Sequence, residues 1–118
     1  MLDGLEHQLL GKLLQATTLR QKVIAQNVAN QNTPGYRRQV VEFEDLLARA
    51  LERNPEKAAE LEPVIATDEL TPGAPDGNNV TLELEMNRMQ QNRLLYEAYM
   101  NIGAMRMELI RAAIQDDR

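Results

Sequence analysis

The 118-residue chain contains no cysteine and no tryptophan, and it has only one phenylalanine and one histidine. Without cysteine it forms neither a disulfide scaffold nor a thiolate metal site. The single His7 has no second histidine or cysteine to complete a site, so we expect no metal and no cofactor. Aromatic residues make up only 3% of the chain, whereas compact globules usually pack larger side chains. The abundant Leu, Ala, Met and Gln favour helices, which predicts a few long helices.

Basic residues are also few: the chain has 13 of them against 18 acidic residues, and its net charge is −5. This balance argues against a nucleic-acid partner, since phosphate binding needs clustered cations. The acids are concentrated in residues 37–78, which carry ten acidic and five basic side chains, while both flanks are near neutral. We therefore expect a solvated middle segment between two flanks that pack.

Long apolar runs are absent too, and none approaches the roughly 20 residues that a membrane-spanning helix needs. No cationic segment followed by an apolar core opens the chain, so we expect no cleaved signal peptide. Taken alone, this would imply the cytoplasm. The sequence also lacks a nucleophile elbow, a phosphate loop and paired catalytic residues. We predict that the protein is not an enzyme and has no catalytic residues.

Residues 2–32 repeat apolar side chains at helical spacing, which predicts an amphipathic helix on the order of 45 Å long. A single helix of this length cannot bury its apolar stripe, so it needs a partner. The packing residues that we predict on it are Leu9, Leu13, Ala16, Leu19 and Val23.

Residues 80–118 form the second long periodic segment. From Met86 to Ile114 the steps of three and four repeat over four heptads, which indicates a coiled-coil seam with Arg93 as a polar member. The seam residues that we predict to pack are Met89, Tyr96, Met100, Gly103, Met107, Ile110 and Ile114. The two segments together predict an all-α fold in which the long N- and C-terminal helices pair as an antiparallel coiled-coil hairpin.

The middle segment, residues 37–79, is predicted to be a partly irregular acidic linker with one short helix. Residues 40–43 favour a short extended piece, and residues 42–53 favour a helix that ends at Asn54 because the next residue is a proline. Residues 56–61 suit one or two further turns of helix.

Four prolines and two glycines between residues 55 and 78 exclude a long helix or a central strand. Residues 71–79 are expected to form an exposed loop. The resulting organisation is 1–36, 37–79 and 80–118, with the first and last parts forming one coiled-coil domain.

A proline–glycine turn ends the first helix. Thr33 precedes a proline and so leaves the helical region, and Pro34-Gly35 suits the central positions of a type II turn. The stretch resembles the Ala-Asn-x-x-Thr-Pro-Gly-Tyr signature of bacterial flagellar axial proteins, the rod, hook and hook-associated subunits. The residues that carry this candidate assembly motif are Asn27, Ala29, Asn30, Asn32, Thr33, Pro34, Gly35 and Tyr36.

The second half strengthens the resemblance. Residues 76–80 and 82–86 are similar to the stretch that opens the last helix of proximal rod subunits of the FlgB type. The resemblance implies a structural subunit of the hollow basal-body rod, at the export-gate end and exported without a cleaved signal. It implies packing against further copies, rod proteins of the FlgC, FlgF and FlgG types, the FliE adaptor and the export gate.

Three alternatives stay open at this point. The first is a proximal rod protein of the FlgC type, which shares the first motif. The second is a cytoplasmic helical adaptor or export chaperone, which would form a stable folded dimer. The third is an amphipathic helix at a membrane surface, although the first helix has only three basic residues and would attract anionic lipid weakly.

Overall fold

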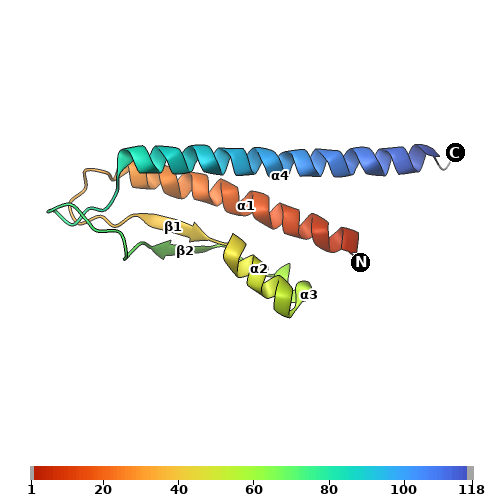
Figure 1. Cartoon of the computed structure of the whole chain (residues 1–118), viewed down its shortest axis with the longest axis horizontal. Coiled ribbons are helices and arrows are strands. Elements are labelled where there is room, and N and C mark those ends of the chain that lie inside the picture. Colours follow the sequence, from red (N-terminus) through yellow and green to blue (C-terminus); the bar gives the residue numbers. More distant parts are fainter. Residues whose placement is uncertain (1, 117–118) are drawn as a thin grey trace.

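Two long antiparallel helices dominate the structure. The computed structural model describes residues 2–116, with the side chains of residues 4–115; the outermost residues of the two predicted terminal segments lie outside it. Helix α1 (Leu2–Ala29) and helix α4 (Leu82–Asp116) lie side by side, and the chain termini lie at the same end of the pair (Figure 1). The molecule is elongated, measuring 68 × 28 × 14 Å. The predicted all-α hairpin is confirmed in its two long helices.

The proline–glycine turn lies just beyond α1. The backbone N–H of Tyr36 donates to the carbonyl of Thr33 at 3.2 Å, which closes the turn. Gly35 has a φ of 75°, as the third residue of a type II turn requires. Helix α1 stops at Ala29, a few residues before the predicted limit, because residues 30–35 are already in turns.

A two-stranded antiparallel ribbon follows the turn. Strand β1 (Gln39–Glu42) pairs with strand β2 (Val64–Thr67), so that Val41 lies opposite Ile65. The extended piece at residues 40–43 was predicted, but β2 was not. Each strand is an edge strand, because the sheet has only two strands. The nearby prolines exclude only a central strand, so they are compatible with this ribbon.

Two short helices lie between the strands. Helix α2 (Glu44–Arg53) begins two residues later than predicted and ends before Asn54, as predicted. Helix α3 (Pro55–Ala58) starts with a proline at its first position, where the missing N–H is not needed. The Asn54 side chain accepts a hydrogen bond from the backbone of Lys57 and caps this helix.

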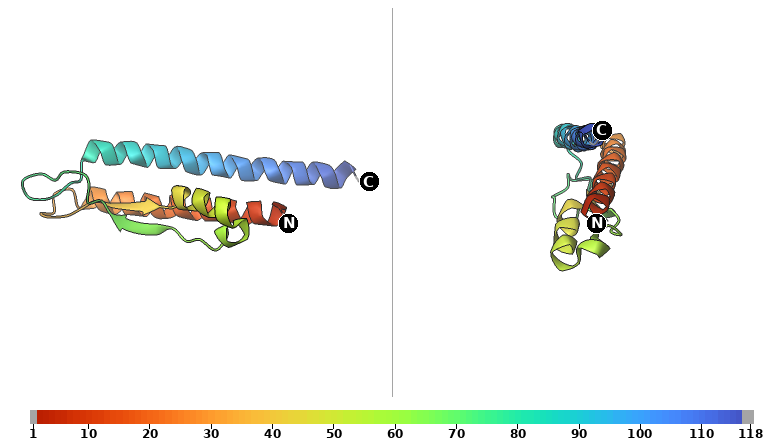
Figure 2. Two further views of the ribbon diagram at one scale, coloured as in Figure 1. Left: turned by 60° about the horizontal axis from the view of Figure 1, so that its bottom comes forward. Right: turned by 90° about the vertical axis from the view of Figure 1, so that its right-hand side faces the viewer.

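The apolar core lies between α1 and the two short helices. Phe43, the only phenylalanine, is 1% exposed and clusters with Ala16, Leu47 and Ala58. Further partly buried side chains pack against this cluster: Leu9, Leu13, Ala50, Leu51 and Leu61. Part of the α1 stripe is therefore covered by the middle segment, which was expected to be solvated. Figure 2 shows α2 and α3 folded back along α1.

The contact between α1 and α4 is close but mixed in chemistry. A β carbon placed on Gly103 would lie 3.3 Å from Cδ2 of Leu10, so the absence of a side chain permits this approach. The Asn92 amide of α4 donates to the carbonyl of Thr17 at 2.8 Å. Among the helices of residues 2–116, none is long and apolar enough to cross a membrane.

Candidate functional site

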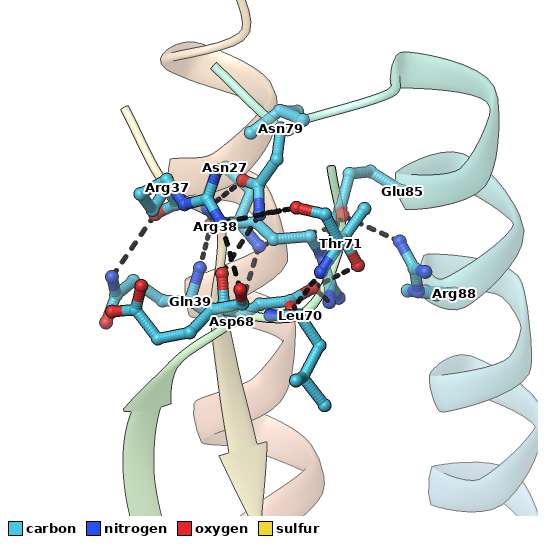
Figure 3. Close-up of polar contacts among 12 residues, drawn as sticks. Asn27, Arg37, Arg38, Gln39, Asp68, Leu70, Thr71, Asn79, Glu85 and Arg88 are labelled. Carbon is cyan, nitrogen blue, oxygen red and sulfur yellow. Dashed lines mark hydrogen bonds and ion pairs between the residues drawn. The ribbon is translucent and has the colours of Figure 1, made fainter. Parts of the chain in front are cut away.

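Buried polar side chains gather where α1 ends and α4 begins. We call this set the polar junction, and it consists of the buried Asn27, Arg38, Asn78, Asn79 and Glu85 and the partly buried Asp68. Figure 3 labels all of these side chains except Asn78. Its members come from α1, the residue just before β1, the residue just after β2, the loop before α4 and the first turn of α4. Within the side chains of residues 4–115, no buried polar atom lacks a hydrogen-bond partner. The buried polar side chains of the junction are therefore all paired within the chain.

Asn27 is fully buried and uses all of its hydrogen-bonding capacity. Its amide nitrogen donates to the carbonyl of Gln39 at 2.8 Å and to Oε2 of Glu85 at 3.2 Å. Its amide oxygen accepts from the backbone N–H of Gln39 at 2.9 Å and from the Tyr36 hydroxyl at 3.1 Å. Burial and the nearby Glu85 carboxylate raise the pKa of Tyr36, which keeps this hydroxyl a donor. One motif residue thus joins α1 to the turn, β1 and α4.

Glu85 is the buried anion of the junction and has no exposed surface. Its Oε1 accepts from Nε of Arg38 at 2.7 Å and from a terminal nitrogen of Arg88 at 2.9 Å. A buried carboxylate is tolerated only when it is paired and hydrogen-bonded in this way. The first turn of α4 is consequently fixed to β1.

Asp68 completes the charge pairs. Its Oδ2 accepts from Arg38 at 2.8 Å and from the Thr71 hydroxyl at 2.6 Å, and its Oδ1 accepts from the backbone N–H groups of Leu70 and Thr71. These bonds hold the pKa of Asp68 well below its usual range. Burial lowers the pKa of Arg38, but its bonds to Asp68 and Glu85 outweigh that effect and raise it.

Residues 71–79 form a loop that is exposed at residues 72–76, as predicted, but Asn78 and Asn79 are buried, at 5% and 4% exposure. The Asn78 amide donates to the carbonyls of Asn30 and Thr33 at 2.9 and 2.8 Å. It therefore adds a second hydrogen bond to two carbonyls of the turns that follow α1, and ties these turns to the loop before α4. Asn79 accepts from the backbone of Arg38 at 2.6 Å.

The two glycine turns cross closely at the same end. The N–H of Gly35 donates to the carbonyl of Asp76 at 2.8 Å, and a β carbon on Gly77 would lie 3.4 Å from Cα of Gly35. Arg37 donates to the carbonyls of Glu69, Thr71 and Gly77. The signature turn is thus tied to the loop before α4.

The other predicted motif residues lie at the outside of this end. Asn32, Thr33, Pro34 and Gly35 are exposed. Asn30 is partly buried, and its amide bonds the Gln26 carbonyl. Ala29, at the end of α1, is exposed. The structure therefore divides the motif into an internal part and a part that faces solvent.

The predicted packing residues of α1 all lie inside: Ala16 and Val23 are buried, and Leu9, Leu13 and Leu19 are partly buried. On α4, Met89 and Gly103 are partly buried. The remaining predicted seam residues are 40–59% exposed: Tyr96, Met100, Met107, Ile110 and Ile114. The structure does not bury this group within the chain, and its packing against neighbouring subunits stays a prediction.

A second heptad series faces α1 instead. It consists of Glu85, Asn92, Tyr99 and Arg106, which are buried or partly buried. This series was missed from the sequence because only apolar residues were used to find the seam. The seven-residue spacing of these side chains was nevertheless a usable signal. Arg106 forms an ion pair with Glu6 of α1.

Arg20 was also missed. It forms a bidentate pair with Glu44 at 2.6 and 3.0 Å, and it donates to the carbonyl of Val41 and to Oδ1 of Asn92. Arginine is suited to such planar recognition of a carboxylate. This single side chain links α1 to β1, α2 and α4.

The chain is similar to known proteins of one kind. The family model described as flagella basal body rod protein matches residues 14–37, which cover the second half of α1 and the turn. The flagellar basal body rod protein FlgB of Borrelia hermsii is 32% identical over 125 residues, covering 88% of this chain and 91% of that protein. The FlgB proteins of Bacillus subtilis and Borreliella burgdorferi are 31% and 26% identical, covering 77% and 79% of this chain, and 78% and 83% of their own lengths.

Proposed function

The chain belongs to the FlgB family of flagellar basal body rod proteins, and from this premise we propose that it builds the proximal part of the rod. It is a structural subunit of the basal body rod and not an enzyme. In our proposal it assembles by helix packing into the hollow shaft at the end that faces the export gate. The three relatives named above are all FlgB proteins, which favours this position over that of a FlgC-type subunit or a cytoplasmic adaptor.

The observation that carries the proposal is the exposed apolar surface of α4. Thirteen large hydrophobic side chains on this helix are 40% or more exposed: Leu82, Leu84, Met86, Leu94, Leu95, Tyr96, Met100, Ile102, Met105, Met107, Leu109, Ile110 and Ile114. Single exposed hydrophobics are normal, but a long continuous set marks an interaction surface. Its methionines can adapt to neighbours of different shape.

The polar junction supports the same proposal. It fixes the angle and register of α4 against α1, so the apolar surface is presented in one orientation. The exposed part of the motif, residues 32–35, lies at the tip of the hairpin. We propose that this tip and the exposed seam residues contact neighbouring subunits in the rod.

The partners and the route follow from the family. We propose contacts with further copies, with rod proteins of the FlgC, FlgF and FlgG types, with the FliE adaptor and with the export gate. We also propose that the chain passes through the flagellar type III export apparatus without a cleaved signal. Its core contains few large buried side chains, so folding of the isolated chain should be completed on association.

The test places charge on the exposed surface. Met100→Asp with Met107→Asp should leave the secondary structure unchanged, because both side chains are about half exposed, yet purified basal bodies should lack the subunit and cells should be non-motile. The control is the pair Met100→Leu and Met107→Leu, which keeps the surface apolar. Normal basal bodies and motility with both aspartates in place would contradict the proposal.

A solution measurement tests the coupling of folding to association. Circular dichroism and mass of the purified chain should show helicity that rises as the chain self-associates. A rigid monomer whose helicity does not change with concentration would remove this part of the proposal.

A further inference from the structure

The outer edge of strand β2 has no partner. Asp68 donates its N–H to the carbonyl of Arg38 at 2.9 Å. Hydrogen-bonded and non-bonded pairs alternate along an antiparallel ladder, so the backbone groups of Ile65 and Thr67 point away from β1. Within residues 2–116 no other segment runs along this side of β2 (Figures 1 and 2), and no hydrogen bond reaches these outward groups.

This edge is shielded only by the shortness of the strand and by Pro63, which precedes it. Native edge strands are blunted by charges, prolines or bulges. The sequence Val64–Thr67 contains no charge and no proline, and its register with β1 is continuous. Val64 and Ile65 point to opposite faces of the ribbon, yet they are 46% and 52% exposed. The strand is therefore open at its edge and on both faces.

The flanks of the strand decide which partner fits. Glu60 and Glu62 precede it and Asp68 and Glu69 follow it, with no basic residue between positions 58 and 69. Lys12 pairs with Glu62 and Arg38 pairs with Asp68, but Glu60 and Glu69 form no ion pair within the described residues. In an antiparallel pairing of two β2 strands, the exposed Glu60 and Glu62 of one copy would lie near Glu69 of the other. Like charges at this distance disfavour a second copy.

We propose that β2 accepts a third strand from a different polypeptide, an extended segment with alternating β-branched residues and with lysine or arginine at its ends. Main-chain bonds to Ile65 and Thr67 would supply affinity, and the exposed carboxylates of Glu60, Glu62 and Glu69 would select basic ends. This surface lies on the ribbon, apart from the apolar surface of α4, and the inference does not depend on the position of the chain in the rod.

The experiment uses the full-length chain and a capped octapeptide, Lys-Arg-Thr-Val-Thr-Val-Arg-Lys, as the probe. Hydrogen–deuterium exchange followed by NMR reports each backbone amide separately. In the free chain the amides of Ile65 and Thr67 should exchange fast, while that of Ala66, bonded to β1, should be slower. With the peptide in excess, exchange at Ile65 and Thr67 should slow by about tenfold or more.

Two controls separate strand addition from other effects. A peptide with glutamate in place of each lysine and arginine should give no protection. Ile65→Pro removes an outward N–H without touching the ladder to β1, so it should abolish the protection of Thr67, whereas Ile65→Thr should retain it.

Unchanged exchange at Ile65 and Thr67 with the basic peptide overturns the inference. So does protection of Ile65 and Thr67 that grows with chain concentration in the absence of peptide and exceeds the change at Ala66, which would identify a second copy as the occupant.

Discussion

Nε of Arg38 lies 2.7 Å from Oε1 of Glu85, and both side chains are buried. The two residues are 47 positions apart in the sequence. Arg38 lies just before β1 and Glu85 lies in the first turn of α4, so this single contact fixes how the second half of the chain returns onto the first. Several consequences of the polar junction can be measured.

Replacing Glu85 by glutamine should strongly destabilise the chain. The change removes the carboxylate that Arg38 and Arg88 share and leaves Arg38 with Asp68 alone. Breaking a buried ion pair by removing one partner costs about 3–5 kcal/mol. Urea denaturation followed by circular dichroism measures the loss in the free energy of unfolding. The control is Glu83→Gln in the same helical turn, where the side chain is exposed. Equal stability of the two variants would show that the ion pair contributes nothing.

Asp68 should make the chain sensitive to acid. Its pKa in the folded state is held well below the ordinary value of 3.8, first by the Thr71 hydroxyl and then by Arg38. The unfolded chain therefore binds this proton more readily, so the stabilisation is complete above about pH 5 and is lost as the pH falls below 3.8. The free energy of unfolding of Asp68→Asn should fall less steeply between pH 5 and pH 2.5, by up to about 1.4 kcal/mol per pH unit. Parallel curves for the two proteins would refute this assignment.

The turn glycine should not tolerate a side chain. Gly35 has a φ of 75°, and a left-handed conformation costs an ordinary residue about 1–2 kcal/mol. Gly35→Ala should lower the midpoint of thermal unfolding. Gly11→Ala is the matched control, since a β carbon there would meet open space within α1 and alanine should add up to about 1 kcal/mol. A stabilising effect at both positions would contradict the turn geometry.

The close approach of α1 and α4 depends on Gly103. Gly103→Leu should force Leu10 aside and cost about 1–3 kcal/mol, as overpacking generally does. Ala104→Leu, at the exposed neighbouring position, should change stability little. Urea midpoints of the two variants compare these effects directly, and indistinguishable midpoints would mean that the helices do not touch at this point.

The long helices and the turn were predictable because their signals are local. Apolar spacing marks both helices, and the pair Pro34-Gly35 restricts the backbone by itself. Asn54 likewise ends α2 because a proline follows it. The short strand β2 was not predictable, since four residues without charge give no indication of the strand with which they pair.

The polar side chains with which α4 faces α1 were missed for a different reason. Glu85 and Asn92 lie in an amphipathic helix, and the apolar heptad series of this helix is offset from them by one residue. In the structure these polar side chains face α1, while Met100 and Met107 face outward. Periodicity identifies a helix surface to within one residue, but it does not tell which of two adjacent faces a partner in the same chain covers.

The arrangement of the two helices has a mechanical consequence. They are fastened by the polar junction at one end, and α4 reaches beyond α1 at the other (Figure 1). A rotation of about 5° at the fastened end shifts a helix tip about 45 Å away by about 4 Å. The tight hydrogen bonding of the junction therefore limits such rotation, and in the proposed rod it would keep the free end of α4 at the same position from copy to copy.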